Sequence, residues 1–491
     1  MKTLNKYVII SLSLLVAFTS CMSELDKDPI GLLTPEIVDT DPTFNSVNYS
    51  VTSSYQLLSN TLNILGDWAW DEGTVTRNDF VLYDIASDDV QKKWSPDGDQ
   101  PWMDEVQRHS YIASNPAFNG IWSYLYEGVS RTNMALSYLN NDEIISAIEM
   151  ESNLRNRLRG EVYFLRAFYY FDLVTNFGDI PLLLTPIEDF SDAYEAAKRV
   201  EASVVWDQIK DDLAKAYDYL PHQVNTSKTD FWRASIGAVI AMQAKVALYS
   251  EDYNTVISKV DELDKLKHYQ LNAHYFDAFD MTKKLTEQEV VFAYNHRSKV
   301  TPREGNGLCA LLGWGFIAPT ESFINEFEPN DPRLSYTVDV NKKAVYKLLG
   351  EVGVSNQGND DAESNKIYIR YADVLLWKAE AFIETGKLAE AIDLINKIRE
   401  RARNTPSLDG VEADLTDRPM VSDKKKVKEW LIHERRVELG FESHRFRDLK
   451  RWGLAKEVLS DQGFADKNYL YPIPQKDIDK SGGLLTQNPG Y

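Results

Sequence analysis

Two pairs of neighbouring segments share one pattern, in which an alanine-rich apolar stretch is followed, across a short polar turn, by a second amphipathic stretch. The first pair runs from Ala234 to Tyr249 and from Tyr253 to Leu263, and the second from Tyr371 to Glu384 and from Leu388 to Arg403. Recurring alanines let two helices approach closely. Each pair therefore predicts an antiparallel helical hairpin, the packing unit of helical-repeat proteins. The spacing does not distinguish tetratricopeptide repeats from a plain helical bundle.

Other stretches also show apolar residues at helical spacing. The strongest runs from Leu154 to Phe177 and should end at Gly178, with Pro181 just beyond. Further helices are expected from about Pro35 to Leu65, from Asn119 to Asn140, and from Ala202 to Tyr219. The sequence thus predicts a mainly all-α fold.

Three long segments between these helices lack helical periodicity. They run from Gly66 to Pro116, from Tyr269 to Arg333 and from Val340 to Asn365, and they are rich in Gly, Asp, Asn and Trp. Such lengths far exceed ordinary connections, and long loops on a rigid scaffold often carry function. We therefore expect a loop-rich face that binds a ligand.

The N-terminus has the anatomy of a secretory signal peptide, with Lys2 and Lys6 before an apolar run from Tyr7 to Phe18. The run is short for a membrane-spanning helix. The residues Phe18 to Cys21 resemble the lipobox of bacterial lipoproteins, in which the cysteine is acylated after cleavage. We expect a signal peptide over residues 1–20 and a lipid anchor on Cys21, so that only acyl chains enter the membrane. An ordinary signal peptide with a chance cysteine is the alternative.

Composition narrows the class of ligand. The net charge of −21 would repel phosphate backbones, so nucleic acid is not an expected partner. Aromatic residues make up 12% of the chain, with 11 Trp and 26 Tyr. Because Tyr and Trp combine an apolar face with a polar group, this content favours a binding surface.

Motifs for catalysis are mostly missing from the sequence. Gly313 to Ala318 matches a dinucleotide fingerprint, but no βαβ pattern flanks it and Pro319 follows, so a loop is expected. Asp88 and Asp89 could be imagined as a glycosidase pair, yet 75 acidic residues make such pairs inevitable. The histidines lack zinc-binding spacing, and the Asp-rich loops lack EF-hand spacing for calcium. We predict no catalytic residue, no metal and no cofactor, with a structural calcium ion as a weak possibility.

Tryptophans in the long loops are the best candidates for ligand contact. They are Trp68, Trp70, Trp94, Trp102 and Trp314. In the stretch DWAWDE from Asp67 to Glu72, two alternate tryptophans of an extended segment would share one face and could stack on a ligand. Alternatively, they plug the loop onto the helices.

A polar rim beside these tryptophans is a further hypothesis. Arg77, Asn78 and Asp89 are its candidate residues.

The segment from Lys424 to Arg451 is unusually basic for this acidic chain. Acidic residues interleave with its lysines and arginines, several at i, i+3 or i+4 spacing. Intramolecular ion pairing fits this pattern better than a polyanion site.

Several blocks together resemble the SusD/RagB family of surface lipoproteins from Bacteroidetes. The blocks are RAFYYFDL from Arg166 to Leu173, FGDIPL from Phe177 to Leu182, RYADVLLWKAEA from Arg370 to Ala381, INKIR from Ile395 to Arg399, ERRVEL from Glu434 to Leu439, RFRDLKRW from Arg445 to Trp452, YPIP from Tyr471 to Pro474, and LTQNPGY from Leu485 to Tyr491. They keep the family's order and span most of the chain.

The resemblance implies a scaffold of tetratricopeptide-like hairpins with a loop-rich face that binds glycan. It implies a single domain over residues 21–491, with an N-terminal helical part at 21–265 and a C-terminal part at 266–491. Family members are non-catalytic lids on SusC-like TonB-dependent transporters in the outer membrane, exposed at the cell surface. The family's ligand residues lie in variable loops, so none transfers to a position of this chain.

Two other functions remain open at this point. RagB-like relatives take up peptide, and loop aromatics would suit a peptide as well as a glycan. A surface hydrolase is disfavoured because no catalytic constellation is recognisable.

Overall fold

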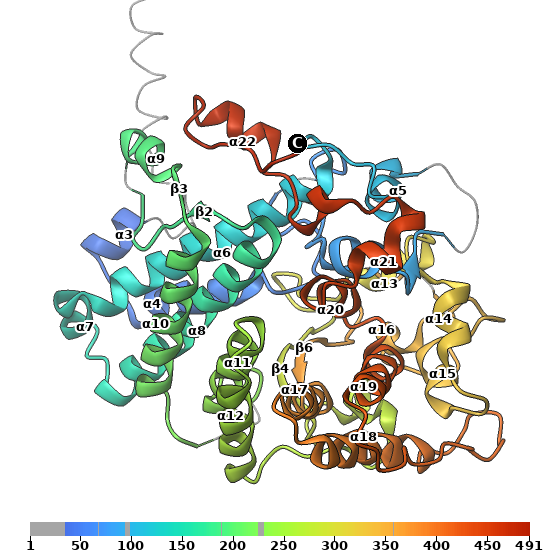
Figure 1. The fold of residues 1–491 in the computed structure, drawn as a ribbon. Helices are drawn as coiled ribbons and strands as arrows, with labels where there is room; N and C mark the ends of the chain where they lie inside the picture. The colour runs from blue at the N-terminus through green and yellow to red at the C-terminus, as the bar shows by residue number, and fades with distance from the viewer. Residues whose placement is uncertain (1–34, 67, 94–98, 188, 224–229, 357) are drawn as a thin grey trace, which may run out of the picture.

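Helices dominate the computed structural model, which describes residues 35–66, 68–93, 99–187, 189–223, 230–356 and 358–491 (Figure 1). The predicted signal peptide and the predicted lipidation residue Cys21 lie outside these residues. No described helix is both long enough and apolar enough to cross a membrane.

Helices make up most of the regular secondary structure in the first half of the chain. Its helices are α3 (Pro35–Thr40), α4 (Phe44–Gln56), α5 (Pro101–Gln107), α6 (Pro116–Asn140), α7 (Asp142–Ala147), α8 (Ser152–Phe177), α9 (Phe190–Ala196), α10 (Ala202–Tyr219), α11 (Ile236–Tyr249) and α12 (Tyr253–Lys265), with a π-helical stretch η1 (Phe80–Ile85).

The second half mixes short and long helices. They are α13 (Leu308–Gly313), α14 (Glu321–Glu326), α15 (Pro332–Thr337), α16 (Tyr346–Leu349), α17 (Tyr371–Glu384), α18 (Leu388–Arg403), α19 (Lys424–Leu439), α20 (Arg445–Arg451), α21 (Ala455–Leu459) and α22 (Gln475–Lys480), with 3-10 turns η2 (Tyr275–Ala278), η3 (Met281–Lys283), η4 (Ser460–Gln462) and η5 (Asp466–Tyr469).

Strands form small antiparallel ladders that tie distant segments together. The described pairs are β1 (Val90–Gln91) with β5 (Ala318–Pro319), β2 (Ile180–Pro181) with β3 (Arg199–Val200), and β4 (Val290–Tyr294) with β6 (Lys366–Arg370).

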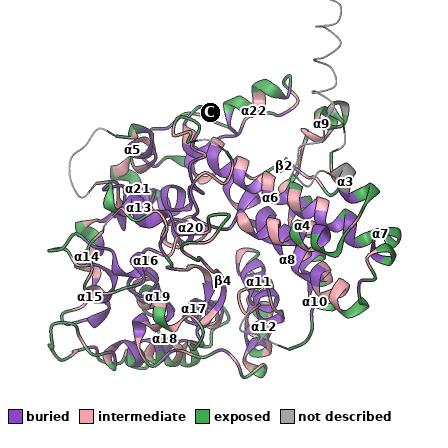
Figure 2. Ribbon diagram, turned by 180° about the vertical axis from the view of Figure 1, so that it is seen from behind, coloured by how far each residue is buried: buried purple, intermediate pink, exposed green. Residues whose placement is uncertain are grey.

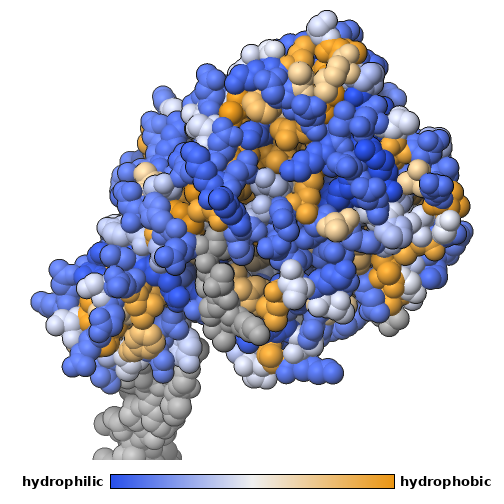
Figure 3. All heavy atoms as spheres, turned by 90° about the horizontal axis from the view of Figure 1, so that it is seen from below, coloured by the Kyte–Doolittle hydropathy of each residue, from blue (hydrophilic) through white to orange (hydrophobic). Residues whose placement is uncertain are grey.

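The long helices pack against one another in chain order, as in helical-repeat arrays. Each helix of this series contacts the next one: α4, α6, α8, α10, α11, α12, α17, α18 and α19. This array fills the left and lower parts of Figure 1, whereas α5, α13 and α14 lie on the other side. The buried faces of the helices form the core of this array (Figure 2). Seen from below, the surface is mostly hydrophilic, with separate apolar patches (Figure 3).

The predicted hairpins are confirmed as α11 with α12 and α17 with α18. Helix α10 has the predicted bounds, and α8 ends at Phe177 as expected. Gly178 stops α8 with φ 72°, and a Cβ there would lie 2.8 Å from Leu470 Cδ1, so this position favours glycine on two grounds.

The predicted helix from Pro35 to Leu65 was wrong, because the structure divides it. Helix α3 ends at Thr40, and Thr43 caps the separate helix α4 by accepting a hydrogen bond from the Ser46 N–H at 3.0 Å. After Gln56 the chain leaves the helix and buries Leu57 and Leu58 completely. The apolar periodicity therefore continues into a buried loop.

The basic run around α19 and α20 is engaged in ion pairs, which confirms the predicted intramolecular pairing. Most partners, however, lie far away in the sequence rather than at i+3 or i+4. The pairs include Arg435 with Asp373 at 2.8 Å, Arg436 with Asp89 at 2.6 Å, Arg445 with Asp88 at 2.8 Å, and Arg447 with Asp172 at 2.7 Å. The segment thus joins the first half of the chain to the second.

Glu438 lies at the centre of this buried network. Its carboxylate accepts hydrogen bonds from Arg333 at 3.1 Å, from Arg370 at 2.7 Å, and from Arg401. Its side chain is fully buried, and so are those of Arg333 and Arg370. Removing one partner from a buried ion pair leaves an uncompensated charge, which costs more than the pair itself contributes.

We expect Glu438→Gln to lower the free energy of unfolding by about 3–5 kcal/mol, because three arginines would then face a neutral amide. Urea denaturation followed by circular dichroism measures this change. Glu429→Gln on the same helix is the matched control, because Glu429 pairs with Lys426 at the surface. The control should change stability by less than about 0.5 kcal/mol. Equal effects of the two variants would contradict the central role of Glu438.

Acid should destabilise the fold through the same carboxylate. Burial alone would raise the pKa of Glu438, but Arg401, Arg370 and Arg333 outweigh it and lower the pKa to about 2. A depressed pKa contributes stability above the unfolded value of about 4.5, and this contribution is lost as pH falls toward 2. Urea midpoints measured across this window should fall less steeply in Glu438→Gln than in the wild type. Parallel profiles would contradict the prediction.

Candidate ligand-binding site

Aromatic side chains from two distant loops meet in one cluster. Trp68 and Trp70 follow α4, whereas Trp314 and Phe316 follow α13. The ring centroids of Trp68 and Trp70 are 5.9 Å apart, those of Trp68 and Trp314 are 6.0 Å apart, and those of Trp70 and Phe316 are 5.7 Å apart. All these contacts are edge-to-face, a favourable geometry for aromatic rings.

The cluster has a buried floor and an exposed edge. Phe316 is buried and Trp70 is half-buried, while Trp68 is 47% and Trp314 41% exposed. Exposing two large indoles side by side is unfavourable in water unless something covers them. The structure thus combines the two alternatives for the DWAWDE stretch. Trp70 packs the loop against Phe316, and Trp68 faces solvent.

Backbone contacts hold both loops in place. The Gly73 N–H donates to the Trp70 carbonyl at 3.0 Å, and the Trp314 N–H donates to the Ala310 carbonyl at 3.0 Å. Beyond Phe316, strand β5 pairs with β1, and the Lys92 ammonium lies 5.5 Å from the centre of the Phe316 ring. The exposed rings therefore extend from a fixed base.

Polar groups lie next to the tryptophans along the chain. Asp71 and Glu72 are exposed, and the Glu72 carboxylate accepts a hydrogen bond from Lys476 at 2.6 Å. The Asn119 side chain donates to the Glu72 carbonyl at 2.7 Å. Stacking faces beside carboxylate and amide groups suit a ligand that has apolar faces and many hydroxyls.

The three polar rim candidates lie in the interior instead. Arg77 is fully buried and pairs with Asp79 at 2.9 Å and with Asp172. The Asn78 side chain is buried and donates to the Gly73 carbonyl at 2.8 Å. A ligand on the surface cannot reach these groups. Asn78 instead holds the Gly73 end of the Trp68–Trp70 loop, and Arg77 is bound in the interior.

Asp89 is also an interior residue, paired with Arg436 at 2.6 Å. Burial, together with the neighbouring charge of Asp88, raises the pKa of Asp89 to about 6 against the opposing effect of Arg436. Asp88 pairs with Arg445 at 2.8 Å. The imagined glycosidase pair is therefore part of the ion network that holds the fold.

Trp102 does not join the cluster. It is buried in α5, where its indole N–H donates to Gln100 Oε1 at 2.7 Å. Trp94 lies outside the described residues. No sequence pattern marks Phe316, the floor of the cluster, and no local pattern connects the segment around Trp314 with the one around Trp68.

Other site chemistry is not evident in the described part of the chain. Within it, no group of three or more His, Cys, Asp or Glu side chains is placed to hold a metal ion. The expected loop is present at residues 314–317, between α13 and β5, and no βαβ unit of the described residues surrounds it. The arrangement can stack on and hydrogen-bond to a ligand.

Comparisons with known proteins agree with this architecture. The sequence model of the SusD family matches residues 329–491, and a second model, described as starch-binding associating with outer membrane, matches residues 39–248. SusD-like protein P2 from Formosa agariphila is 25% identical over 99% of this chain and 100% of its own length. The chain belongs to the SusD-like family.

Solved structures share the fold. A SusD superfamily protein from Bacteroides vulgatus is 25% identical, with a TM-score of 0.72 over 91% of this chain and 99% of its own. Surface glycan-binding protein A from Bacteroides thetaiotaomicron, solved in complex with laminarihexaose, is 19% identical, with a TM-score of 0.71 over 91% of this chain and 99% of its own. The predicted helical SusD-like fold is therefore confirmed.

The tryptophan cluster can be tested without a ligand. Replacing Trp70 with Phe should remove an exciton couplet from the far-ultraviolet circular dichroism spectrum, because indoles in edge contact couple their transitions. The couplet is measured as the wild-type spectrum minus the variant spectrum. Trp430→Phe is the control, because the described contact of Trp430 is with Arg418 rather than with another indole. A single-signed difference for Trp70→Phe would contradict the cluster.

Proposed function

We propose that the protein is a non-catalytic glycan-binding lipoprotein of the cell surface. It captures oligosaccharide or polysaccharide and delivers it to a SusC-like TonB-dependent transporter in the outer membrane. The observation that carries this proposal is the pair of exposed indoles, Trp68 and Trp314, which lie against the half-buried Trp70 and, beneath it, the buried Phe316. Sugar rings have apolar faces that stack on indoles, and this stacking explains why large aromatic groups stay exposed.

The comparisons support the ligand class and the location. The structural neighbour from Bacteroides thetaiotaomicron holds laminarihexaose, and one matching family model is described as starch-binding and associated with the outer membrane. In this proposal residues 1–20 are a signal peptide and Cys21 carries the lipid anchor. Residues 21–491 form one domain with parts 21–265 and 266–491, and the ion pairs between the two parts support their assignment to a single domain.

A peptide ligand is the second candidate. The net charge of −21 and the exposed carboxylates of Asp71 and Glu72 beside the cluster would favour a basic peptide.

Titration with plant, fungal and host oligosaccharides, followed by tryptophan fluorescence and calorimetry, tests the proposal. We expect one glycan class to saturate the signal. Trp68→Ala and Trp314→Ala should each weaken binding about 10-fold, or ~1.4 kcal/mol, because each removes one stacking face.

Tyr49→Ala is the matched control, because Tyr49 is an exposed aromatic residue of α4 outside the cluster. It should bind like the wild type. Saturation by peptides but by no glycan would instead indicate that the protein functions in peptide uptake. If Trp68→Ala and Trp314→Ala bind glycan as tightly as Tyr49→Ala does, the cluster is not part of the binding site. Release of reducing sugar would contradict the non-catalytic assignment.

A further inference from the structure

A third loop reaches the tryptophan cluster at Gly358. This glycine belongs to the long segment between α16 and β6, and its φ is 65°. A Cβ at this position would lie 3.6 Å from Trp314 Nε1 and 4.0 Å from Trp314 Cδ1. Because both atoms belong to the pyrrole ring, the Gly358 backbone passes beside the part of the indole that carries the N–H group. The site therefore has a wall that the aromatic contacts alone do not show.

Hydrogen bonds fix this loop relative to α13, the helix that ends just before the indole. On one side of Gly358, the Asn356 side chain donates to the Leu312 carbonyl of α13 at 3.4 Å. On the other side, the Asn306 N–H, just before α13, donates to the Ala362 carbonyl at 2.8 Å. Gly358 thus lies between two points of the loop that are tied to the same helix.

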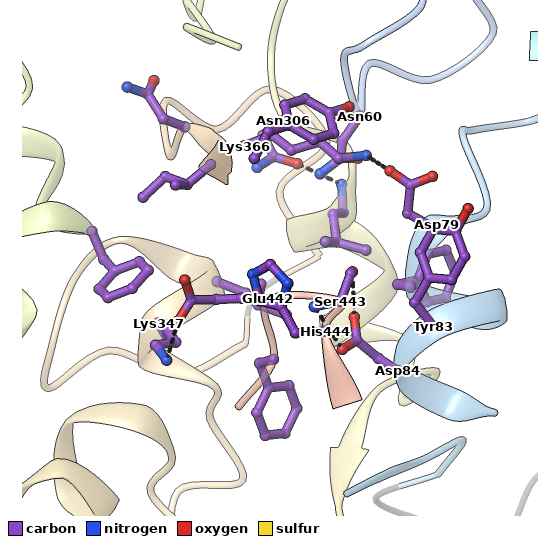
Figure 4. A pocket seen from close by; sticks show the side chains of 18 of the residues that line it. Asn60, Asp79, Tyr83, Asp84, Asn306, Lys347, Lys366, Glu442, Ser443 and His444 are labelled. Atoms are coloured by element: carbon purple, nitrogen blue, oxygen red, sulfur yellow. Dashed lines mark hydrogen bonds and ion pairs between the residues drawn. The ribbon is translucent and has the colours of Figure 1, made fainter. Parts of the chain in front are cut away.

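Asn306 itself is anchored in the interior. It is buried and lines an internal pocket, where Figure 4 shows its side chain together with those of Asn60 and Lys366. The Asn306 side chain donates to the Ser364 carbonyl at 2.9 Å, and the Lys366 ammonium donates to Asn60 Oδ1 at 2.9 Å. The base of the loop is therefore buried and bonded, which keeps the loop in place beside the indole.

The indole N–H of Trp314 is available to a ligand. The backbone N–H of Trp314 donates to the Ala310 carbonyl, but no acceptor for its indole N–H lies within the described residues, and its side chain is partly exposed. Trp452, by contrast, donates its indole N–H to the Glu380 carboxylate at 2.9 Å. An exposed donor beside a stacking face suits a ligand that has both apolar faces and hydrogen-bond acceptors.

Backbone conformation explains the glycine at 358 only in part. A positive φ favours glycine wherever it occurs. Gly353, in the same segment, has φ 82°, and a Cβ there would meet no described group within 4 Å. Backbone conformation alone therefore accounts for Gly353. At Gly358 a side chain would in addition rest on the pyrrole ring and cover its N–H group, because 3.6 Å is van der Waals contact.

We propose that Gly358 is a specificity-determining position of the glycan site. Because it has no side chain, it leaves the Nε1–H of Trp314 open to a hydroxyl oxygen of the sugar next to the stacked one. The site then selects glycans that present a hydroxyl at this edge over those that lack one. This inference rests on the proposed function and adds a hydrogen bond to the stacking contacts.

Gly358→Asn tests access to the indole without any ligand. Asparagine tolerates a positive φ, and its side chain would cover the pyrrole ring. In tryptophan-labelled protein observed by NMR, a soluble gadolinium chelate should broaden the indole N–H signal of Trp314 in the wild type. Most of this broadening should be lost in Gly358→Asn. The signal is assigned by its absence from Trp314→Phe.

Gly353→Asn is the matched control, because it makes the same substitution at a positive φ in the same segment, away from the indole. Its Trp314 signal should broaden as in the wild type. Equal broadening in Gly358→Asn and Gly353→Asn would overturn the proposal. Both variants carry the same type of backbone change, so a general folding defect would appear in both.

The glycan identified by titration provides the second test. Gly358→Asn should weaken its binding about 5-fold, because one hydrogen bond is lost, whereas Gly353→Asn should bind like the wild type. Equal affinities of these two variants, with binding still weakened in Trp314→Ala, would overturn the role of Gly358 and leave the proposed function intact. If the wild type binds no glycan, the proposed function and this inference both fail.

Discussion

Paired buried charges hold the two halves of this chain in register. Glu438 on α19 binds three arginines of the second half, while Arg436 and Arg447 bind carboxylates of the first half. Because a buried charge without its partner is costly, these contacts must form together or not at all. Helix packing alone builds the array of α4 to α19, but the ion network fixes where the loops of the first half meet the helices of the second.

Both loops of the tryptophan cluster depend on that network. Arg77, just after the Trp68–Trp70 stretch, is fixed by Asp79 and Asp172. Asp89, just before β1, is fixed by Arg436, and β1 pairs with the strand that follows Phe316. The side chains that look like a polar binding rim in the sequence are therefore interior residues, and two of them, Asn78 and Asp89, lie in contacts that hold the segments next to the rings.

The sequence predicts the scaffold well and the site only in part. Periodicity and capping glycines give α8, α10 and both hairpins almost to the residue, because these signals act within one element. The split at Thr43 comes from a local cap with Ser46 that the apolar periodicity does not reveal, whereas the burial of Arg77 depends on Asp172, far away in the chain. Likewise, the alternation of Trp68 and Trp70 identifies one loop of the cluster, but its meeting with Trp314 is a tertiary fact.

Helix α13 connects the buried interior with the exposed indoles. Asn306 and Leu308, at its start, are buried, and Trp314 follows its last residue. Asn306 is held by hydrogen bonds from its side chain to Ser364. A short helix held at its start presents its far end in one orientation, which reduces the entropy lost when a ligand stacks there. The orientation of Trp314 thus depends on contacts made in the interior of the protein.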